Sequence, residues 1–176
     1  VSICPIAMRY PRGNTTAWDE SATEPIQLGK GMVLQEGSDV AIFAVGVMIE
    51  TAIAVAEILK EQGLAVAVIN ARFVKPLDEE LLQQFAERCQ LILTLEENVI
   101  AGGFGSAVLE FLQQSETVVP VQTIGLPDRY ISQGSPEQQR EGAGLSVTKI
   151  VGSIIGRLKE LTPRIQKQSK TVKKAS

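Results

Sequence analysis

Continuous apolar runs alternate with amphipathic segments along most of the chain. Four runs rich in β-branched residues are typical of strands buried on both faces of a parallel sheet, at 39–46, 64–70, 91–97 and 118–125. Four segments with apolar residues at helical spacing follow them, at 47–63, 76–89, 102–115 and 146–161. This alternation predicts an α/β fold with a mostly parallel sheet and helices on both faces.

Turn and capping residues set the predicted ends of these elements. Gly63 is expected to end the first helix, while Asp78 and Ser146 are expected to cap the second and the last. The glycine-punctuated segment 26–37 is predicted to lie at an edge, and residues 126–144 are predicted to form a long loop.

The two ends of the chain differ from this pattern. Residues 1–10 have the pattern of a strand, and residues 11–25 have that of a linker. Residues 159–176 hold six Lys/Arg and one Glu, a net charge of +5, so the total of −3 leaves −8 on the other residues. The polar, basic end is predicted to be a disordered tail, either simply solvated or bound to an anionic partner.

Composition excludes several kinds of site and partner. The chain has no histidine, which rules out a Ser-His-Asp triad or a His-ligated metal built from this chain alone. Its acidic main part argues against nucleic-acid binding, and no apolar run is long enough to cross a membrane or resembles a signal peptide. Cys4 and Cys89 are expected to be buried reduced thiols, although a disulfide remains open.

Two glycine-containing turns precede predicted helices. AVGVMIETA has one glycine, so it does not match a dinucleotide-binding turn. AGGFGSA lacks the Gly-Lys-Ser/Thr of a nucleotide-binding loop. Its glycines either allow an anion to approach the free N–H groups of the helix, or let the turn pack closely under a neighbouring domain or subunit.

Charged residues follow two of the predicted strands. Glu96 and Glu97 are adjacent, so they point to opposite faces and cannot form a facing acid/base pair. One of them is expected to form a hydrogen bond or cap a helix. Arg72 is expected to pair with one of these carboxylates or to contact a substrate. Asp128 and Arg129 are likewise expected to form an Asp-Arg pair in a rigid turn or to contact a substrate.

The segment MRYPRGN places two arginines at the end of the first predicted strand. Pro11 turns the chain after Arg9 and Tyr10 and changes the direction of Arg12. An arginine at such a transition is suited to bidentate binding of a phosphate or carboxylate. A surface salt bridge is the alternative.

Several of these strings occur together in order and resemble one family. They closely resemble the C-terminal part of the 1-deoxy-D-xylulose-5-phosphate synthases, thiamine-diphosphate enzymes of the transketolase group, over about residues 1–158. The strings are RYPRGN, GKG, ARFVKPLDEELL, LTLEENVIAGGFGSAVLEFL and IGLPDRYI followed by QGS. Many relatives have a histidine where this chain has Ser132-Gln133-Gly134, so any role of that histidine does not transfer.

The resemblance implies a fold, a reaction and cofactors. The fold would be like a transketolase C-terminal domain. The family enzyme is a homodimer that condenses pyruvate with glyceraldehyde 3-phosphate to 1-deoxy-D-xylulose 5-phosphate and CO2, using thiamine diphosphate and Mg²⁺. The product serves non-mevalonate isoprenoid (terpenoid), thiamine and pyridoxal synthesis. Such enzymes would be cytoplasmic in bacteria and lie in the plastid stroma of plants or algae.

The resemblance also implies a domain division. Residues 1–15 would end the pyrimidine-binding domain, 16–29 would be a linker, 30–161 the C-terminal domain and 162–176 the tail. The family's metal motif, catalytic histidines and activating glutamate are absent from this sequence. The chain alone is therefore expected to bind no cofactor or metal, to supply no catalytic residue and to be inactive.

Individual residues can be matched to the family's motifs. Arg12, and second Arg9, would bind the substrate phosphate, with Tyr10 and Asn14 in support. The residues expected to act in domain packing or at an interface are Glu96, Asn98, Gly102, Gly103, Gly105, Asp128 and Arg129.

Two alternatives remain. The chain could be a non-catalytic assembly subunit of a split transketolase-like enzyme. It could also belong to another enzyme of this fold, such as a 2-oxoacid dehydrogenase β subunit, which RYPRGN together with ARFVKPLD disfavours.

Overall fold

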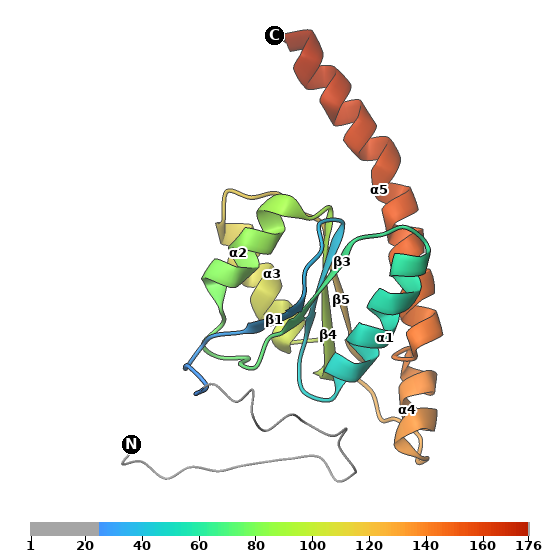
Figure 1. Cartoon of the computed structure of the whole chain (residues 1–176). Helices are drawn as coiled ribbons and strands as arrows, with labels where there is room; N and C mark the ends of the chain where they lie inside the picture. Colours follow the sequence, from blue (N-terminus) through green and yellow to red (C-terminus); the bar gives the residue numbers. More distant parts are fainter. Residues whose placement is uncertain (1–24, 176) are drawn as a thin grey trace.

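The computed structural model describes residues 25–175 of the chain, and the side chains of residues 25–161 (Figure 1). Strands and helices alternate through most of this length. The elements are β1 (Met32–Gln35), β2 (Val40–Ala44), α1 (Met48–Glu61), β3 (Val66–Asn70), α2 (Glu79–Arg88), β4 (Leu91–Val99), α3 (Phe104–Gln114), β5 (Val121–Leu126), α4 (Pro136–Ala143) and α5 (Val147–Ala175).

The five strands form one mixed sheet in the order β1-β3-β2-β4-β5. β2 pairs in parallel with β3 and β4, and β4 pairs in parallel with β5. Among the strands of the described residues, only β1 is antiparallel, at the edge beside β3. The predicted mostly parallel sheet and its edge segment are therefore confirmed.

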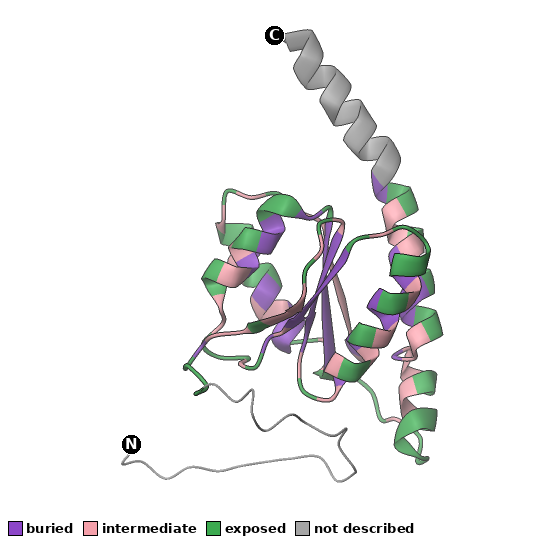
Figure 2. Cartoon of the chain, in the orientation of Figure 1, coloured by how far each residue is buried: buried purple, intermediate pink, exposed green. Residues whose placement is uncertain are grey.

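Helices cover both faces of the sheet. α1 and α5 pack on one face, where Ile42 and Leu93 belong to the core. α2 and α3 pack on the other, against Phe43 and Ile92. Because successive strand residues point to opposite faces, the central strand β2 is buried along its whole length (Figure 2). This explains its continuous apolar run.

The predicted end of helix α1 and the predicted start of helix α2 agree with the structure. Gly63 follows the end of α1 with φ +84°, a left-handed conformation that glycine adopts without strain. Asp78 caps α2 by accepting a hydrogen bond from the Leu81 N–H at 3.3 Å. Its other carboxylate oxygen accepts one from the Gly31 N–H at 2.9 Å, which fixes the start of β1 against α2.

The loop predicted at 126–144 contains a helix, α4. Ser135 caps it reciprocally with Gln138: the Ser135 Oγ accepts from the Gln138 N–H at 3.2 Å, and the Gln138 Oε1 accepts from the Ser135 N–H at 3.0 Å. Pro136 occupies the first turn, and Gly144 ends the helix with φ +85°. Ser-Pro-Glu-Gln is a capping-box sequence, so the loop prediction was wrong here.

The last helix is longer than predicted. α5 extends past Leu161 to Ala175, through most of the segment 162–176 that was predicted as a disordered tail. Lys, Arg, Gln and Ala favour helix, and no glycine occurs after Gly156. Within the part of the chain that the structure describes, no helix is long and apolar enough to span a membrane.

Cys89 is a buried free thiol, 7% exposed. Burial raises the pKa of this thiol, which favours its protonated form. The structure thus supports the buried, reduced state predicted for Cys89. Cys4 lies outside the described residues.

Candidate functional site

Glu96 caps the amino end of helix α3. Its side chain is buried, 2% exposed, at the end of the apolar part of β4. The Oε2 atom accepts from the Phe104 N–H and the Oε1 atom from the Gly105 N–H, both at 2.8 Å. A carboxylate is stabilised there by these charge-assisted bonds and by the helix dipole. The helix-capping prediction for one of the two glutamates is confirmed.

Two further amides of this turn are also bonded within the chain. The Gly103 N–H donates to the Ile100 carbonyl at 3.2 Å, and the Gly102 N–H donates to Ser106 Oγ at 3.0 Å. The Ser106 hydroxyl in turn donates to the Ile100 carbonyl at 2.9 Å. Because Glu96 and Ser106 already use the N–H groups of this turn, the close-packing explanation of its glycines fits better than an external anion.

Gly105 and Gly103 lie where a side chain would overlap neighbouring atoms. A Cβ atom on Gly105 would lie 2.7 Å from both Thr94 Oγ1 and Thr123 Cγ2, on β4 and β5. One on Gly103 would overlap the Glu96 carboxylate and the Val99 carbonyl. These glycines therefore allow α3 to lie close to the sheet. These neighbours belong to the same chain. The predicted contact of the glycines with another domain or subunit therefore stays a prediction.

We call the region where Glu96 and the glycines of this turn join helix α3 to β4 and β5 the Glu96 junction. Two further residues lie in it that were not singled out from the sequence. Gly125 on β5 approaches the Asn98 carbonyl oxygen, to which a Cβ atom would come within 2.8 Å. Thr94 is fully buried, and its hydroxyl has no hydrogen-bond partner among the described residues. Thr94 could have been noticed in the sequence because it is a polar residue inside the apolar run LILTLEE. Nothing in the sequence distinguishes Gly125 from the other glycines.

Glu97 and Arg72 do not form the pair that the sequence suggested. Glu97 Oε1 lies 3.2 Å from Arg140 Nη1, which links β4 to α4. Arg72 Nη2 instead donates to Met32 Sδ at 3.0 Å. The pairing prediction for Arg72 was wrong because β2 separates β3 from β4 in the sheet, an order that the local sequence does not reveal.

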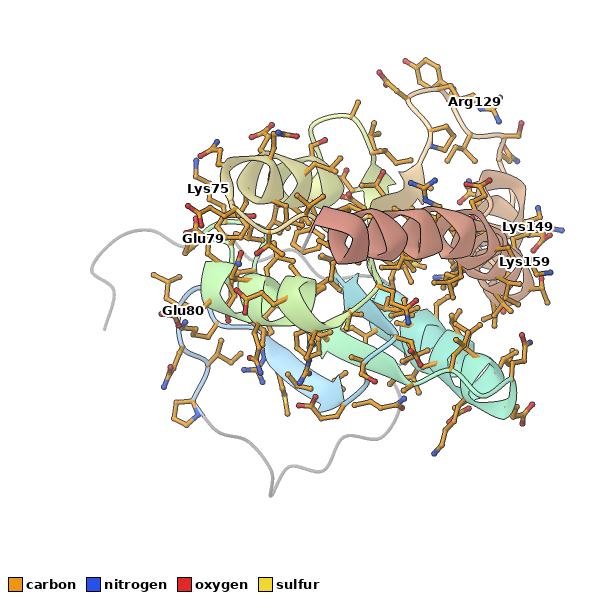
Figure 3. All side chains as sticks on the ribbon, turned by 90° about the horizontal axis from the view of Figure 1, so that it is seen from above. Lys75, Glu79, Glu80, Arg129, Lys149 and Lys159 are labelled. Carbon is orange, nitrogen blue, oxygen red and sulfur yellow. The ribbon has the colours of Figure 1, made fainter. Side chains whose placement is uncertain are left out.

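The predicted turn at Asp128 and Arg129 is present without an ion pair between them. The Arg129 N–H donates to the Pro127 carbonyl at 2.8 Å. Both side chains are exposed, and Figure 3 shows Arg129 at the rim of the domain, on the loop after β5. Asn98 and Gly102 are exposed as well. These positions are accessible, and their interface role stays a prediction.

The two candidate phosphate ligands, Arg9 and Arg12, lie outside the described residues, together with Tyr10 and Asn14. Their assignment rests on the sequence alone.

The fold and the Glu96 junction define an α/β domain whose described candidate residues cap a helix and pack it on a sheet. The family model described as "Transketolase, C-terminal domain" matches residues 29–150. The chain belongs to this family.

Curated relatives extend the similarity over most of the chain. It is 50% identical over 150 residues to a 1-deoxy-D-xylulose-5-phosphate synthase of Desulforudis audaxviator, covering 84% of this chain and 24% of the relative. It is 46% identical over 153 residues to the synthase of Thermosynechococcus vestitus, covering 86% of this chain and 24% of the relative. The chain thus spans about a quarter of the length of these proteins.

Solved structures agree on the fold. One described as "Split gene transketolase, inactive beta4 tetramer" is similar with a TM-score of 0.70 and 35% identity, over 74% of this chain and 43% of that one. A transketolase from Campylobacter jejuni, 19% identical, has a TM-score of 0.56 over 73% of this chain and 18% of that chain.

Proposed function

We propose that this chain is the C-terminal domain of a thiamine-diphosphate-dependent synthase that joins pyruvate and glyceraldehyde 3-phosphate to 1-deoxy-D-xylulose 5-phosphate and CO2. The observation that carries the proposal is the 43–50% identity to proteins named as this synthase. Since the chain spans about a quarter of their length, we assign the reaction to a larger protein or complex of which this chain forms one part.

Among the described residues, no cluster of acidic, histidine or cysteine side chains is arranged to hold a metal ion such as Mg²⁺. The buried carboxylate that could bind such a group, Glu96, uses both oxygens on the amides of helix α3. We therefore assign the cofactor, the metal and the catalytic groups to other domains, and derive no catalytic step from this chain. Its proposed contribution is a rigid domain that packs in a homodimeric enzyme.

The isolated chain is expected to form no product. The test is to supply it with thiamine diphosphate, Mg²⁺, pyruvate and glyceraldehyde 3-phosphate and to measure deoxyxylulose phosphate. The control is the T. vestitus synthase under the same conditions. Turnover by the chain alone above background would show that it contains the catalytic groups, contrary to the proposal.

Arg12 is expected to bind the phosphate of the aldehyde substrate. The test uses a chimera in which this chain replaces the matching part of the T. vestitus synthase. Arg12→Ala should raise the KM for glyceraldehyde 3-phosphate by roughly ten- to a hundredfold, because a hydrogen bond to a charged group contributes about 1.5–3 kcal/mol. The KM for pyruvate should change little. Equal effects on both substrates, or none, would disprove the assignment, and Arg9→Ala tests the second candidate.

A second candidate function is an assembly subunit of a split enzyme. The observation that favours it is the similarity, at 35% identity and a TM-score of 0.70, to the solved split-gene transketolase. The gene distinguishes the two. An upstream reading frame continuous with Val1 supports a domain of a longer protein, whereas a start codon near it and a separate partner gene support a split subunit.

A further inference from the structure

Exposed apolar side chains gather where the described chain begins. We name Ile26, Leu28, Met32 and Val74 the entry patch; their exposed fractions are 68%, 78%, 36% and 48%. They are four of the eight large hydrophobic residues that are exposed in the described part of the chain. Because exposed apolar residues that form one patch can mark a contact with another protein, these four residues are a candidate contact surface.

The two segments that carry the entry patch lie side by side. Met32 pairs with Asn70 at the carboxyl end of β3, and its Sδ atom accepts the hydrogen bond from Arg72. A Cβ atom on Gly29 would lie 2.8 Å from Pro76 Cγ, so the segment before β1 also contacts the loop after β3. In Figure 1 the blue segment from residue 25 runs past this loop into β1. The segment 29–32 and the loop 70–76 therefore lie against each other on this side of the domain.

Arg72 gives the entry patch a positive charge in an unusual conformation. Its φ is +55°, in the left-handed region that non-glycine residues rarely adopt. The Asn70 Oδ1 atom holds this conformation by accepting from the Arg72 N–H at 3.0 Å. A thioether sulfur is a weak acceptor, so the exposed guanidinium has donor capacity left for a carboxylate. Strained residues of this kind concentrate at functional surfaces.

The position of the patch indicates what covers it. Residues 1–24 join the domain at Pro25, directly before Ile26. The curated relatives are about four times as long as the part matched here. Under the proposed function a domain precedes residue 25, and tethering would give it a high effective concentration next to the patch.

We propose that the entry patch is the surface on which the preceding, cofactor-binding domain of the enzyme packs, with apolar side chains on the patch and a carboxylate facing Arg72. This rests on the proposed function, since it assumes that such a domain precedes residue 25. The patch was not among the interface residues expected from the sequence.

Thiol labelling tests this packing directly. Val74→Cys and Val118→Cys are compared in the isolated chain and in the chimera, with the labelled peptides separated by mass spectrometry from those of Cys4 and Cys89. Val118 is the matched control because it is 97% exposed and lies before β5, at the opposite end of the parallel strands from Val74. Labelling at position 74 should be at least tenfold slower in the chimera, while labelling at position 118 should be unchanged.

The other outcomes contradict the proposal in different ways. Equal labelling of position 74 in both proteins, or equal protection of both positions in the chimera, means that the preceding domain does not pack on this patch. Protection in the isolated chain that increases with its concentration identifies a second copy as the occupant and overturns the proposal. A chimera that protects position 74 but forms no product contradicts the proposed function and leaves the packing surface standing.

Discussion

Replacing Glu96 with alanine is expected to lower the free energy of unfolding of the chain by about 3 kcal/mol, because two buried N–H donors lose a charged acceptor. The donors are the amides of Phe104 and Gly105, each 2.8 Å from a carboxylate oxygen. For a domain of this size the melting temperature should fall by roughly 6–12 °C. Differential scanning calorimetry and urea unfolding measure both quantities.

The neighbouring glutamate provides the matched control. Glu97 forms an ion pair with Arg140 in which the side chains are 37% and 30% exposed, so Glu97→Ala should cost about 1 kcal/mol or less. The loss of stability caused by Glu96→Gln should lie between those of Glu96→Ala and Glu97→Ala. The Gln amide oxygen can accept from one N–H, while its NH2 group faces the other N–H. Equal small effects of Glu96→Ala and Glu97→Ala would show that the buried cap does not stabilise the domain.

Gly105→Ala is expected to lower the free energy of unfolding by about 2–3 kcal/mol, since overpacking a well-packed core costs this much. The added methyl group would lie 2.7 Å from Thr94 Oγ1 and from Thr123 Cγ2. Neither side chain is the flexible end of a long residue, so helix α3 must move away from the sheet. The measurement is again the urea midpoint together with its slope.

A Gly→Ala substitution at a helical position with free space around it should instead raise the free energy of unfolding. Gly152 lies in α5 with no atom within 4 Å of an added Cβ atom. Gly152→Ala should therefore stabilise the chain by about 0.5–1 kcal/mol, because alanine favours helix over glycine. A neutral Gly105→Ala variant would mean that α3 does not depend on this close approach.

Most of the fold could be predicted because burial on both faces leaves a clear pattern. The strands β2, β3 and β4 are continuous apolar runs in the sequence and are almost fully buried in the structure. Helix α4 was missed because none of its residues is buried, so it has no apolar stripe and only its capping box marks it. The extended end of α5 was missed for a related reason, since a polar, basic composition fits a solvated helix as well as a disordered tail.

The candidate site was predicted only as far as local geometry determines it. Adjacent Glu96 and Glu97 must point to opposite faces, which allowed a cap to be expected for one of them. The partner of Arg72 depends on strand order, and the partner of Glu97 lies on a helix that the sequence did not reveal. The close approach of Gly105 to two strands depends on how α3 packs on the sheet, and spacing along the chain does not specify that.

The activity of the chimera tests the central claim most directly. The claim is that this chain completes a thiamine-diphosphate-dependent synthase without supplying catalytic groups. The measurement is the rate of deoxyxylulose phosphate formation by the chimera, compared with the same T. vestitus protein lacking its matching part. The account predicts that joining this chain raises the rate at least tenfold, with a dependence on thiamine diphosphate and Mg²⁺. A chimera that unfolds in a single cooperative transition, yet is no more active than the shortened protein, would contradict it.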